Sequence, residues 1–582
     1  MSRTLIFHSF ASEKPRFEFR SLLISIALAA SLCALESLYF NNGLVRSAQD
    51  AFFQSTDGFA VFFAYLYLAV SLFFLWSLIY LILCSRPMVK IVATLILIFA
   101  VFVEFSYLRA VGRFTIPFDI TIAMTATSDQ KTDSLLAFSS FAWVPFIVLL
   151  VACSFLPQTG RSIHSFRPMG IWVFFAMIYY VQLSFFAPLL SGQRLVSSSF
   201  DAFAQISADY FLTKPMELMS PPVRIKVLPA VESKELPTNN VVVIFDESIR
   251  GDHLSINGYK RQTTPFLEQL EKQNLLTNWG VAVSSSTASH PSYDAFITGA
   301  TPELLAVRPQ SEINQMPTIF QYAKAMNYKT HLLDGQMKYY WGGIKDDVNY
   351  VDSLVTLNDI DPGRIEDYER RGEIKLSEDD RDGMKQWEID AKLAKIVQEI
   401  FAGSTGNFIF VYKRGVHFPY EKNFPKDEMR WAPIYYFKNQ WEVPPGDAHD
   451  AIVNSYDNSI AYNLDDFFEI LLQGQQTLPN KTTIIYTSDH GESFYAGGKA
   501  GHGGDTKEEA LVPLFTLGLD RNSVDSKFPA SHSNIFTTLL DLVGYPNQYR
   551  GYPYAVSLLK AKRNDARPRS FNLADGKRIA FD

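Results

Sequence analysis

Hydrophobic and polar positions divide this chain of 582 residues into two parts. Up to residue 192, apolar side chains form long runs, whereas beyond residue 240 short apolar runs alternate with amphipathic stretches. The long runs occupy residues 21–40, 59–84, 90–111, 141–156 and 170–190. A helix needs about 20 apolar residues to cross a bilayer. We therefore expect residues 1–192 to form a five-helix transmembrane domain.

Lys and Arg are distributed unevenly around these runs. With the amino terminus inside, eight of the 12 basic residues up to position 192 fall on inner segments and four on outer loops. This bias predicts an inner-membrane protein whose residues 193–582 lie in the periplasm. Its three cysteines, Cys33, Cys84 and Cys153, all lie in the apolar runs, so the exported part has no disulfide. No basic stripe is present, which argues against a nucleic-acid partner.

The exported part begins with a connector and continues as an α/β domain. Residues 193–240 combine an amphipathic stretch with several prolines, which predicts a linker before a catalytic domain at 241–582. Buried strands are predicted at 241–245, 329–333, 407–412, 482–487 and 512–517. Helices are predicted at 265–272, 317–326, 386–401, 451–472 and 534–543. Such alternation favours a sheet covered by helices on both faces.

Polar side chains with metal-binding chemistry follow two of these strands. The first strand ends in Asp246 and Glu247, and the strand at 482–487 leads to Asp489 and His490. Because carboxyl ends of parallel strands meet at one edge of a sheet, these groups predict a shared metal site. His417 follows the strand at 407–412, and His502 lies in a glycine-rich loop. Each histidine taken alone is more often structural than a ligand.

A run of hydroxyl side chains, Ser284–Ser289, follows another apolar stretch and precedes a short helical segment. A hydroxyl is a poor nucleophile until a bound divalent cation lowers its pKa. Such a run also caps helices, because its oxygens accept backbone N–H bonds. From the residues alone, the helix-capping interpretation is favoured over the nucleophile.

The ordered set of motifs resembles the phosphoethanolamine transferases of the alkaline phosphatase superfamily, which include the colistin-resistance enzymes. The segments that match are Asp246-Glu247-Ser248, Gly258–Pro265, Thr287–Pro291, His417-Phe418-Pro419, Ser455–Asn458, Ser488–Glu492 and His502-Gly503. The resemblance implies an alkaline-phosphatase-like α/β/α sandwich with a central, mostly parallel sheet. It also implies one or two zinc ions as cofactors.

Carried over by position, the resemblance makes Thr287 the nucleophile, with Ser286 as the fallback. Glu247, Thr287, Asp489 and His490 are then the ligands of the catalytic zinc. His417 and His502 hold a second zinc or the transferring phosphate. Lys338 and Thr127 match substrate-contacting positions. Separately, Glu104 near the outer end of an apolar run is a candidate for binding an ammonium headgroup, although pairing with Arg109 or Arg113 is the favoured interpretation.

The implied activity is transfer of phosphoethanolamine from phosphatidylethanolamine, through a phospho-threonine-type intermediate, to an envelope acceptor. Lipid A, lipopolysaccharide core sugars and periplasmic glucans all remain candidates. The alternatives are a phosphoglycerol transferase or phosphodiesterase on the same scaffold, and a non-catalytic membrane scaffold. Two departures from the family stand out. Asp246 replaces a glycine and is expected to face away from the metal, while Ala123 and Lys131 alter the predicted headgroup pocket.

Overall fold

The computed structural model describes residues 23–30 and 87–111, single positions between 73 and 80, and most of the chain after residue 222. That last part comprises residues 223–228 and 237–582 apart from 308–309, 337–347, 361–385, 438–441, 443, 473–477, 496–500 and 575. The chain divides into two compact units, one from residues 1–105 and 142–208 and the other from residues 106–141 and 209–582.

Helix α4 (Pro87–Val111) is the longest described element before residue 223, with 25 residues, and it contains the apolar run predicted at 90–111. The other four predicted crossings lie mostly outside the described residues. Among the residues that the structure describes, no helix has both the length and the apolar character needed to cross a membrane.

The described strands of the second unit form a seven-stranded sheet in the order β2-β7-β6-β1-β5-β3-β4. Their bounds are β1 (Asn240–Asp246), β2 (Leu276–Val283), β3 (Lys329–Asp334), β4 (Ser353–Val355), β5 (Asn407–Tyr412), β6 (Thr482–Ser488) and β7 (Leu511–Leu517). Strand β7 runs antiparallel to both of its neighbours, and the remaining pairs are parallel. The predicted mostly parallel sheet is therefore confirmed.

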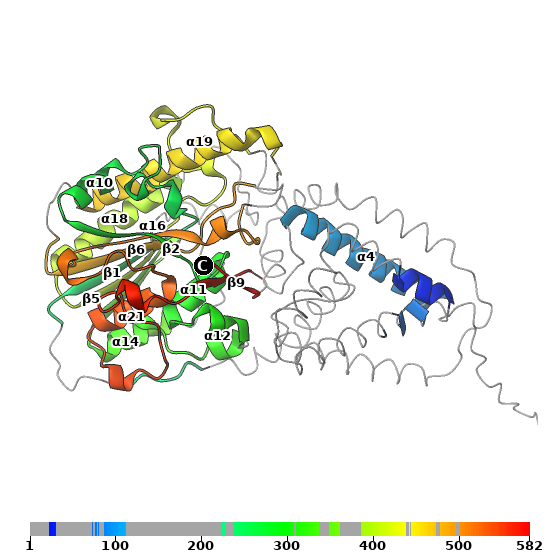
Figure 1. Cartoon of the computed structure of the whole chain (residues 1–582), viewed down its shortest axis with the longest axis horizontal. Coiled ribbons are helices and arrows are strands. Elements are labelled where there is room, and N and C mark those ends of the chain that lie inside the picture. The colour runs from blue at the N-terminus through cyan, green and yellow to red at the C-terminus, as the bar shows by residue number, and fades with distance from the viewer. Residues whose placement is uncertain are drawn as a thin grey trace, which may run out of the picture. The chain divides into compact units, whose positions relative to one another are not determined.

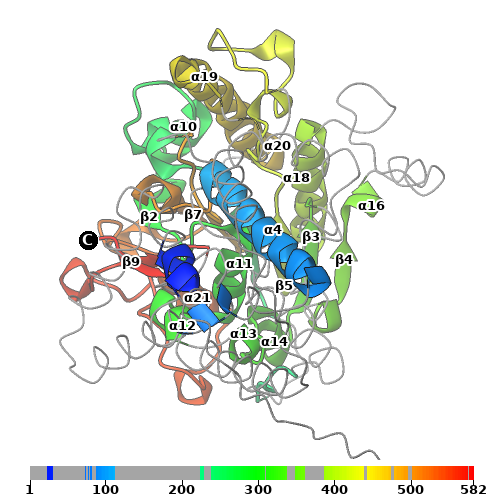
Figure 2. The ribbon, with the colours of Figure 1, turned by 90° about the vertical axis from the view of Figure 1, so that its right-hand side faces the viewer.

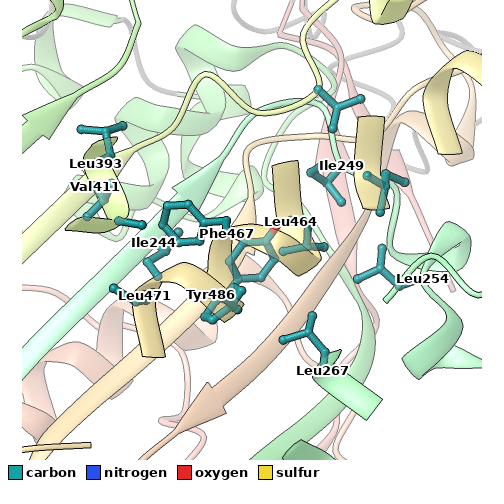
Figure 3. Close-up of a cluster of buried hydrophobic side chains, with 14 of the residues drawn as sticks. Ile244, Ile249, Leu254, Leu267, Leu393, Val411, Leu464, Phe467, Leu471 and Tyr486 are labelled. Carbon is teal, nitrogen blue, oxygen red and sulfur yellow. The ribbon is translucent and has the colours of Figure 1, made fainter. Parts of the chain in front are cut away.

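Both faces of the sheet are buried because the middle of each central strand carries consecutive apolar side chains. In β1, Val242 and Ile244 pack into one core, whereas Val241, Val243 and Phe245 pack into the other. This split follows from the two-residue period of a strand, which points successive side chains to opposite faces. Figure 3 shows part of the first core, where Ile244 and Tyr486 of the sheet meet Phe467 and Leu471.

Helices cover each face and close the two cores, as Figures 1 and 2 show. One face carries α10 (Pro265–Lys272), α16 (Leu357–Ile360), α18 (Gln386–Gly403), α19 (His449–Ile460) and α20 (Asp466–Leu472). The other carries α11 (Ser289–Thr298), α14 (Ile319–Ala325) and α21 (His532–Leu542). Two short helices, α12 (Pro302–Val307) and α13 (Gln310–Ile313), lie between α11 and α14 in the chain. The predicted three-layer arrangement is thus observed.

Several element boundaries differ from the predictions for identifiable reasons. The helix predicted from Pro317 begins at Ile319, after the N-cap Thr318, whose backbone N–H donates to the Gln321 side chain over 3.0 Å. The long helix predicted at 451–472 is interrupted by a π-helical segment, η8 (Ala461–Asp465), between α19 and α20. A small hairpin of β8 (Ser570–Asn572) and β9 (Arg578–Ala580) was not predicted, since its strands are only three residues long.

Candidate active site

The site lies where three neighbouring strands end. β1 is flanked by β6 and β5, and all three run parallel, so their carboxyl ends share one edge. The chain beyond β1 provides Glu247, the chain beyond β6 provides Asp489 and His490, and the chain beyond β5 leads to His417. Ligands of open α/β sheets bind at this edge.

Glu247, Asp489 and His490 form a compact group whose candidate ligand atoms all lie within 4.8 Å of one another. His490 Nε2 is 3.6 Å from Glu247 Oε1 and 3.5 Å from Asp489 Oδ2. All three side chains are buried. The structure thus brings together three of the four residues predicted to hold the catalytic zinc.

Hydrogen bonds fix the orientation of both carboxylates. The Ser248 hydroxyl donates to Glu247 Oε1 over 2.8 Å, while Gln336 and Tyr412 donate to Glu247 Oε2 over 3.2 and 3.3 Å. Asp489 Oδ1 accepts the backbone N–H groups of Ser248 and His490, at 2.9 and 2.7 Å. Asp489 Oδ2, in contrast, has no hydrogen-bond partner among the described residues.

Ser248 itself has a φ of 61°, in the left-handed region that non-glycine residues adopt uncommonly. The Tyr456 hydroxyl holds this turn, because it donates to the Ser248 carbonyl over 2.6 Å and accepts the Arg250 N–H over 2.7 Å. A strained backbone held in place by its surroundings is a common feature of functional sites.

Burial makes the charged state of this group costly. Desolvation, with a further contribution from Asp489, raises the pKa of Glu247 to about 8. Desolvation also raises the pKa of Asp489 to about 6 and lowers the pKa of His490 to about 4. Two buried carboxylates beside a neutral imidazole, with one carboxylate oxygen lacking a donor, match the requirements of a divalent cation.

The tautomer of His490 follows from its surroundings. Its Nδ1 lies 2.7 Å from the Gly491 carbonyl oxygen, which can only accept a hydrogen bond. Nδ1 therefore carries the proton and Nε2 presents a lone pair to the group. A backbone carbonyl that orients the distal nitrogen in this way is typical of metal-binding histidines.

A second group lies beside the first. His490, Glu492 and His502 also have candidate ligand atoms within 4.8 Å of one another. The rings of His490 and His502 stack with centroids 4.5 Å apart, and the ring of His417 is 6.3 Å from that of His502. Burial opposes a charge on His502, yet the Glu492 carboxylate, 3.1 Å from its Nδ1, raises its pKa to about 9. Glu492 belongs to the Ser-Asp-His-Gly-Glu motif but was not among the predicted ligands.

Within the hydroxyl run Ser284–Ser289, the side chain that contacts the first group is that of Ser289. Its Oγ is 3.0 Å from His490 Nε2 and 3.5 Å from Glu247 Oε1. Ser289 is the first residue of α11, so its side chain also lies at the positive end of the helix dipole. The sequence did not single out Ser289 within the hydroxyl run, because five candidate hydroxyls occur within six residues.

The Thr287 hydroxyl points to another partner, since it donates to the Gly504 carbonyl oxygen over 3.1 Å. The backbone of Thr287 is held on both sides, with its N–H bonded to Asn572 of β8 and its carbonyl bonded to the Gly503 N–H. Ser286 forms a bridge with Asn572. Strand β8 therefore fixes the turn that presents Ser289 to the carboxylates.

The remaining predicted site residues are placed as follows. Glu104 is a buried residue of α4. Lys338 and Thr127 lie outside the described residues. Asp246 faces away from the first group, as expected, because its carboxylate hydrogen-bonds to Lys413 and Tyr486 on the α18–α20 side of the sheet.

Comparisons with known proteins agree with this geometry. Two curated relatives from Escherichia coli are a Kdo(2)-lipid A phosphoethanolamine 7''-transferase of strain K12, 23% identical over 52% of this chain, and the phosphatidylethanolamine transferase Mcr-1, 24% identical over 52%. These alignments cover 51% and 53% of the relatives, so the chain spans about half the length of the curated relatives it matches.

A solved structure shares the fold. The integral membrane protein lipooligosaccharide phosphoethanolamine transferase A from Neisseria meningitidis superposes with a TM-score of 0.55 at 17% identity, covering 88% of this chain and 95% of that one. The resemblance to phosphoethanolamine transferases of the alkaline phosphatase superfamily is thus confirmed. The sulfatase family model matches residues 239–545, more than half of the chain, and includes every residue of both groups. The chain belongs to the sulfatase family.

Proposed function

We propose that this protein transfers phosphoethanolamine from phosphatidylethanolamine to a lipid or glycan acceptor of the bacterial envelope. The observation that carries the proposal is the convergence of the Ser289 hydroxyl on Glu247, Asp489 and His490 at the edge of the sheet. The names of the relatives support the transferred group, and the predicted orientation of the apolar runs supports a periplasmic site on the inner membrane.

The residues present fit a zinc ion. Glu247, Asp489 and His490 would hold it, and the donor-free Asp489 Oδ2 supports this assignment. His502 and Glu492, with His417 nearby, would hold a second cation or the transferring group. When bound, the metal lowers the pKa of a neighbouring hydroxyl and offsets charge on the phosphoryl oxygens.

Within this site, Ser289 is the better-placed nucleophile. In the described arrangement its hydroxyl donates to the lone pair of His490 Nε2, whereas the Thr287 hydroxyl is committed to a backbone carbonyl. The first backbone N–H groups of α11 have no intrahelical partners and lie next to the serine, so they favour the negative charge of a phosphoryl group there. Thr287 remains the alternative that the resemblance predicts.

The reaction proceeds in two steps. Ser289 Oγ attacks phosphorus and loses its proton. The bond between phosphorus and the glycerol oxygen breaks, and diacylglycerol leaves with a proton gained on that oxygen. An acceptor hydroxyl then attacks the same phosphorus, loses its proton, and returns Ser289 to its hydroxyl form. Holding the phosphoryl group against fixed charges while it changes partners is the main contribution that a protein makes to such transfers.

The test is to identify the modified residue. The full chain in lipid nanodiscs is incubated with phosphatidylethanolamine labelled in the headgroup, quenched in acid, digested, and analysed by mass spectrometry. We expect the phosphoethanolamine group on Ser289, release of diacylglycerol, and loss of both in Ser289→Ala. Thr287→Ala is the matched control and should retain the adduct.

Three results would redirect the proposal. An adduct on Thr287 or Ser286 would move the nucleophile within the same turn. An adduct formed from phosphatidylglycerol alone would make the protein a phosphoglycerol transferase. If a chain that contains zinc forms no adduct and releases no diacylglycerol from either lipid, that result would contradict transferase activity.

A further inference from the structure

A buried ion pair lies directly beneath the site, at the ends of β1 and β5. Lys413 Nζ is 2.6 Å from Asp246 Oδ2, and both side chains are fully buried. The two residues are neighbours across the strand pair, because Phe245 and Tyr412, which precede them, are in register. Their side chains point to the α18–α20 side of the sheet, opposite to Phe245 and Tyr412.

The pair is built into its surroundings by further contacts. Lys413 Nζ also donates to the Asn463 carbonyl over 2.6 Å and lies 4.3 Å from the centroid of the Phe467 ring. The Tyr486 hydroxyl donates to Asp246 Oδ2 over 2.7 Å. Buried charges that are paired and hydrogen-bonded hold one geometry, because any departure leaves a charge unsolvated.

The same two residues are tied to the backbone that carries the site. Asp246 Oδ1 accepts the N–H of Glu247 over 2.9 Å, and the Glu247 carbonyl accepts the N–H of Val416 over 3.1 Å. Lys413 leads into the segment 414–417, which ends at His417. The ion pair therefore couples the turn that presents Glu247 to the segment that presents His417.

A second carboxylate secures that segment from below. Asp390 of α18 accepts the N–H groups of Arg414 and Gly415, each over 2.8 Å, and its Oδ2 is 3.7 Å from Lys413 Nζ. Gly415 has a φ of 60° and packs against the Glu247 backbone. Lys413 thus lies between two carboxylates. Asp246 is bonded to the backbone of Glu247, and Asp390 is bonded to the backbone of the segment 414–417.

We infer that Asp246 and Lys413 are positioning residues that fix Glu247 and the segment leading to His417 in the arrangement that holds the metal. This inference rests on the proposed function. If the pair only filled space, a neutral pair of the same volume would fill the interior equally well. The inference instead gives the two charges a role in positioning the site.

The experiment is a double-mutant cycle on the full chain in nanodiscs with Asp246→Asn, Lys413→Met and the double variant. Thermal unfolding measures stability, chelator competition measures the affinity for zinc alone, and the labelled-lipid assay measures adduct formation. The matched control is Asp541→Asn, because Asp541 pairs with Arg550 at 2.6 Å and Lys560 at 2.9 Å on the opposite, α21 side. This control likewise removes the carboxylate of an ion pair, but one that lies nearer the surface, since the Lys560 side chain is exposed.

Each single variant should lose stability and bind zinc at least tenfold more weakly. Asp246→Asn leaves Lys413 with only the more distant Asp390, and Lys413→Met leaves two buried carboxylates without their cation. The double variant should recover part of the stability lost in Lys413→Met, because Asp390 alone then lacks its cation, but it should keep the tenfold loss in zinc affinity, with a matching loss in adduct formation. Asp541→Asn should lose stability while its zinc affinity stays within twofold of the wild type.

Other outcomes overturn the inference. A double variant that binds zinc and forms the adduct as the wild type does would show that the pair only fills space. A control that loses zinc affinity as strongly would show that general destabilisation explains the effect. A wild-type chain that binds no zinc would overturn the proposed function and this inference together, whereas the first two outcomes leave the proposed function intact.

Discussion

Replacing Gly415 by alanine should damage the site from beneath, because a Cβ at this position has no room. It would overlap Asp246 Oδ1 and lie 2.7 Å from the carbonyl oxygen and 2.8 Å from the nitrogen of Glu247. Backbone atoms cannot rotate away as a side-chain tip can, so the segment 414–417 or the Glu247 turn has to shift. The carboxylate of Glu247, a proposed metal ligand, is attached to that turn.

The magnitude has two parts. A left-handed conformation costs an L-residue about 1–2 kcal/mol relative to glycine, and forcing an extra methyl group into a packed interior costs about 1–3 kcal/mol. Gly258 separates these parts, because its φ is 91° and a Cβ there would meet nothing within 4 Å. Gly258→Ala should therefore show only the backbone cost, so the two variants should differ by about 1–3 kcal/mol.

The assay combines thermal unfolding of the full chain with zinc titration by chelator competition. At about 2–4 °C per kcal/mol for a large domain, the expected difference in Tm between the two variants is measurable. Gly415→Ala should also bind zinc at least tenfold more weakly, while Gly258→Ala should not. Equal stability and equal zinc affinity in the two variants would refute the reasoning.

Three further predictions concern the scaffold. Burial raises the pKa of Asp465 to about 7, although the carboxylate accepts two backbone N–H groups at the start of α10. The folded state therefore holds this proton more tightly than the unfolded chain does. Stability should fall as pH rises from about 4 to 7. Asp465→Asn should flatten that slope in thermal unfolding measured across pH, and an unchanged slope would contradict the assignment. Tyr456→Phe removes the hydroxyl that bridges Ser248 and Arg250, and it should lower the free energy of unfolding by about 1–3 kcal/mol and weaken zinc binding. Unchanged stability would contradict the claim that this hydroxyl holds the turn at Ser248. Leu393→Ala should lower the free energy of unfolding by about 2–5 kcal/mol, because it opens a cavity in the core beside α18. Zinc affinity should persist, and its loss would mean that the zinc-binding residues respond to any destabilisation.

Much of the fold could be predicted because the central strands are continuous apolar runs. The five predicted strands all exist within one or two residues of their expected bounds, and β-branched stretches such as Val241–Ile244 leave little alternative. β2 was not among the predicted strands, since Asn278 and Gly280 interrupt its apolar pattern where the strand bulges. The π-helical segment between α19 and α20 leaves no trace in the hydrophobic periodicity of the sequence.

The site was predictable as far as strand ends determine it. Glu247, Asp489 and His490 follow directly from strands that lie side by side, and the direction of the buried Asp246, away from this group, follows from strand alternation. The choice among neighbouring hydroxyls was not predictable, because Thr287 and Ser289 are only two residues apart where the turn enters α11. That turn is fixed by β8, almost 300 residues further along the chain, and the local sequence does not predict this contact.

The most direct measurement is a crystal structure of the chain with zinc, with the metal located by anomalous scattering at the zinc edge. We predict a zinc ion about 2.0–2.2 Å from oxygen or nitrogen atoms of Glu247, Asp489 and His490, with Ser289 Oγ as its neighbour. A zinc ion bound elsewhere, or a Ser289 side chain turned away from these three residues, would contradict the central claim.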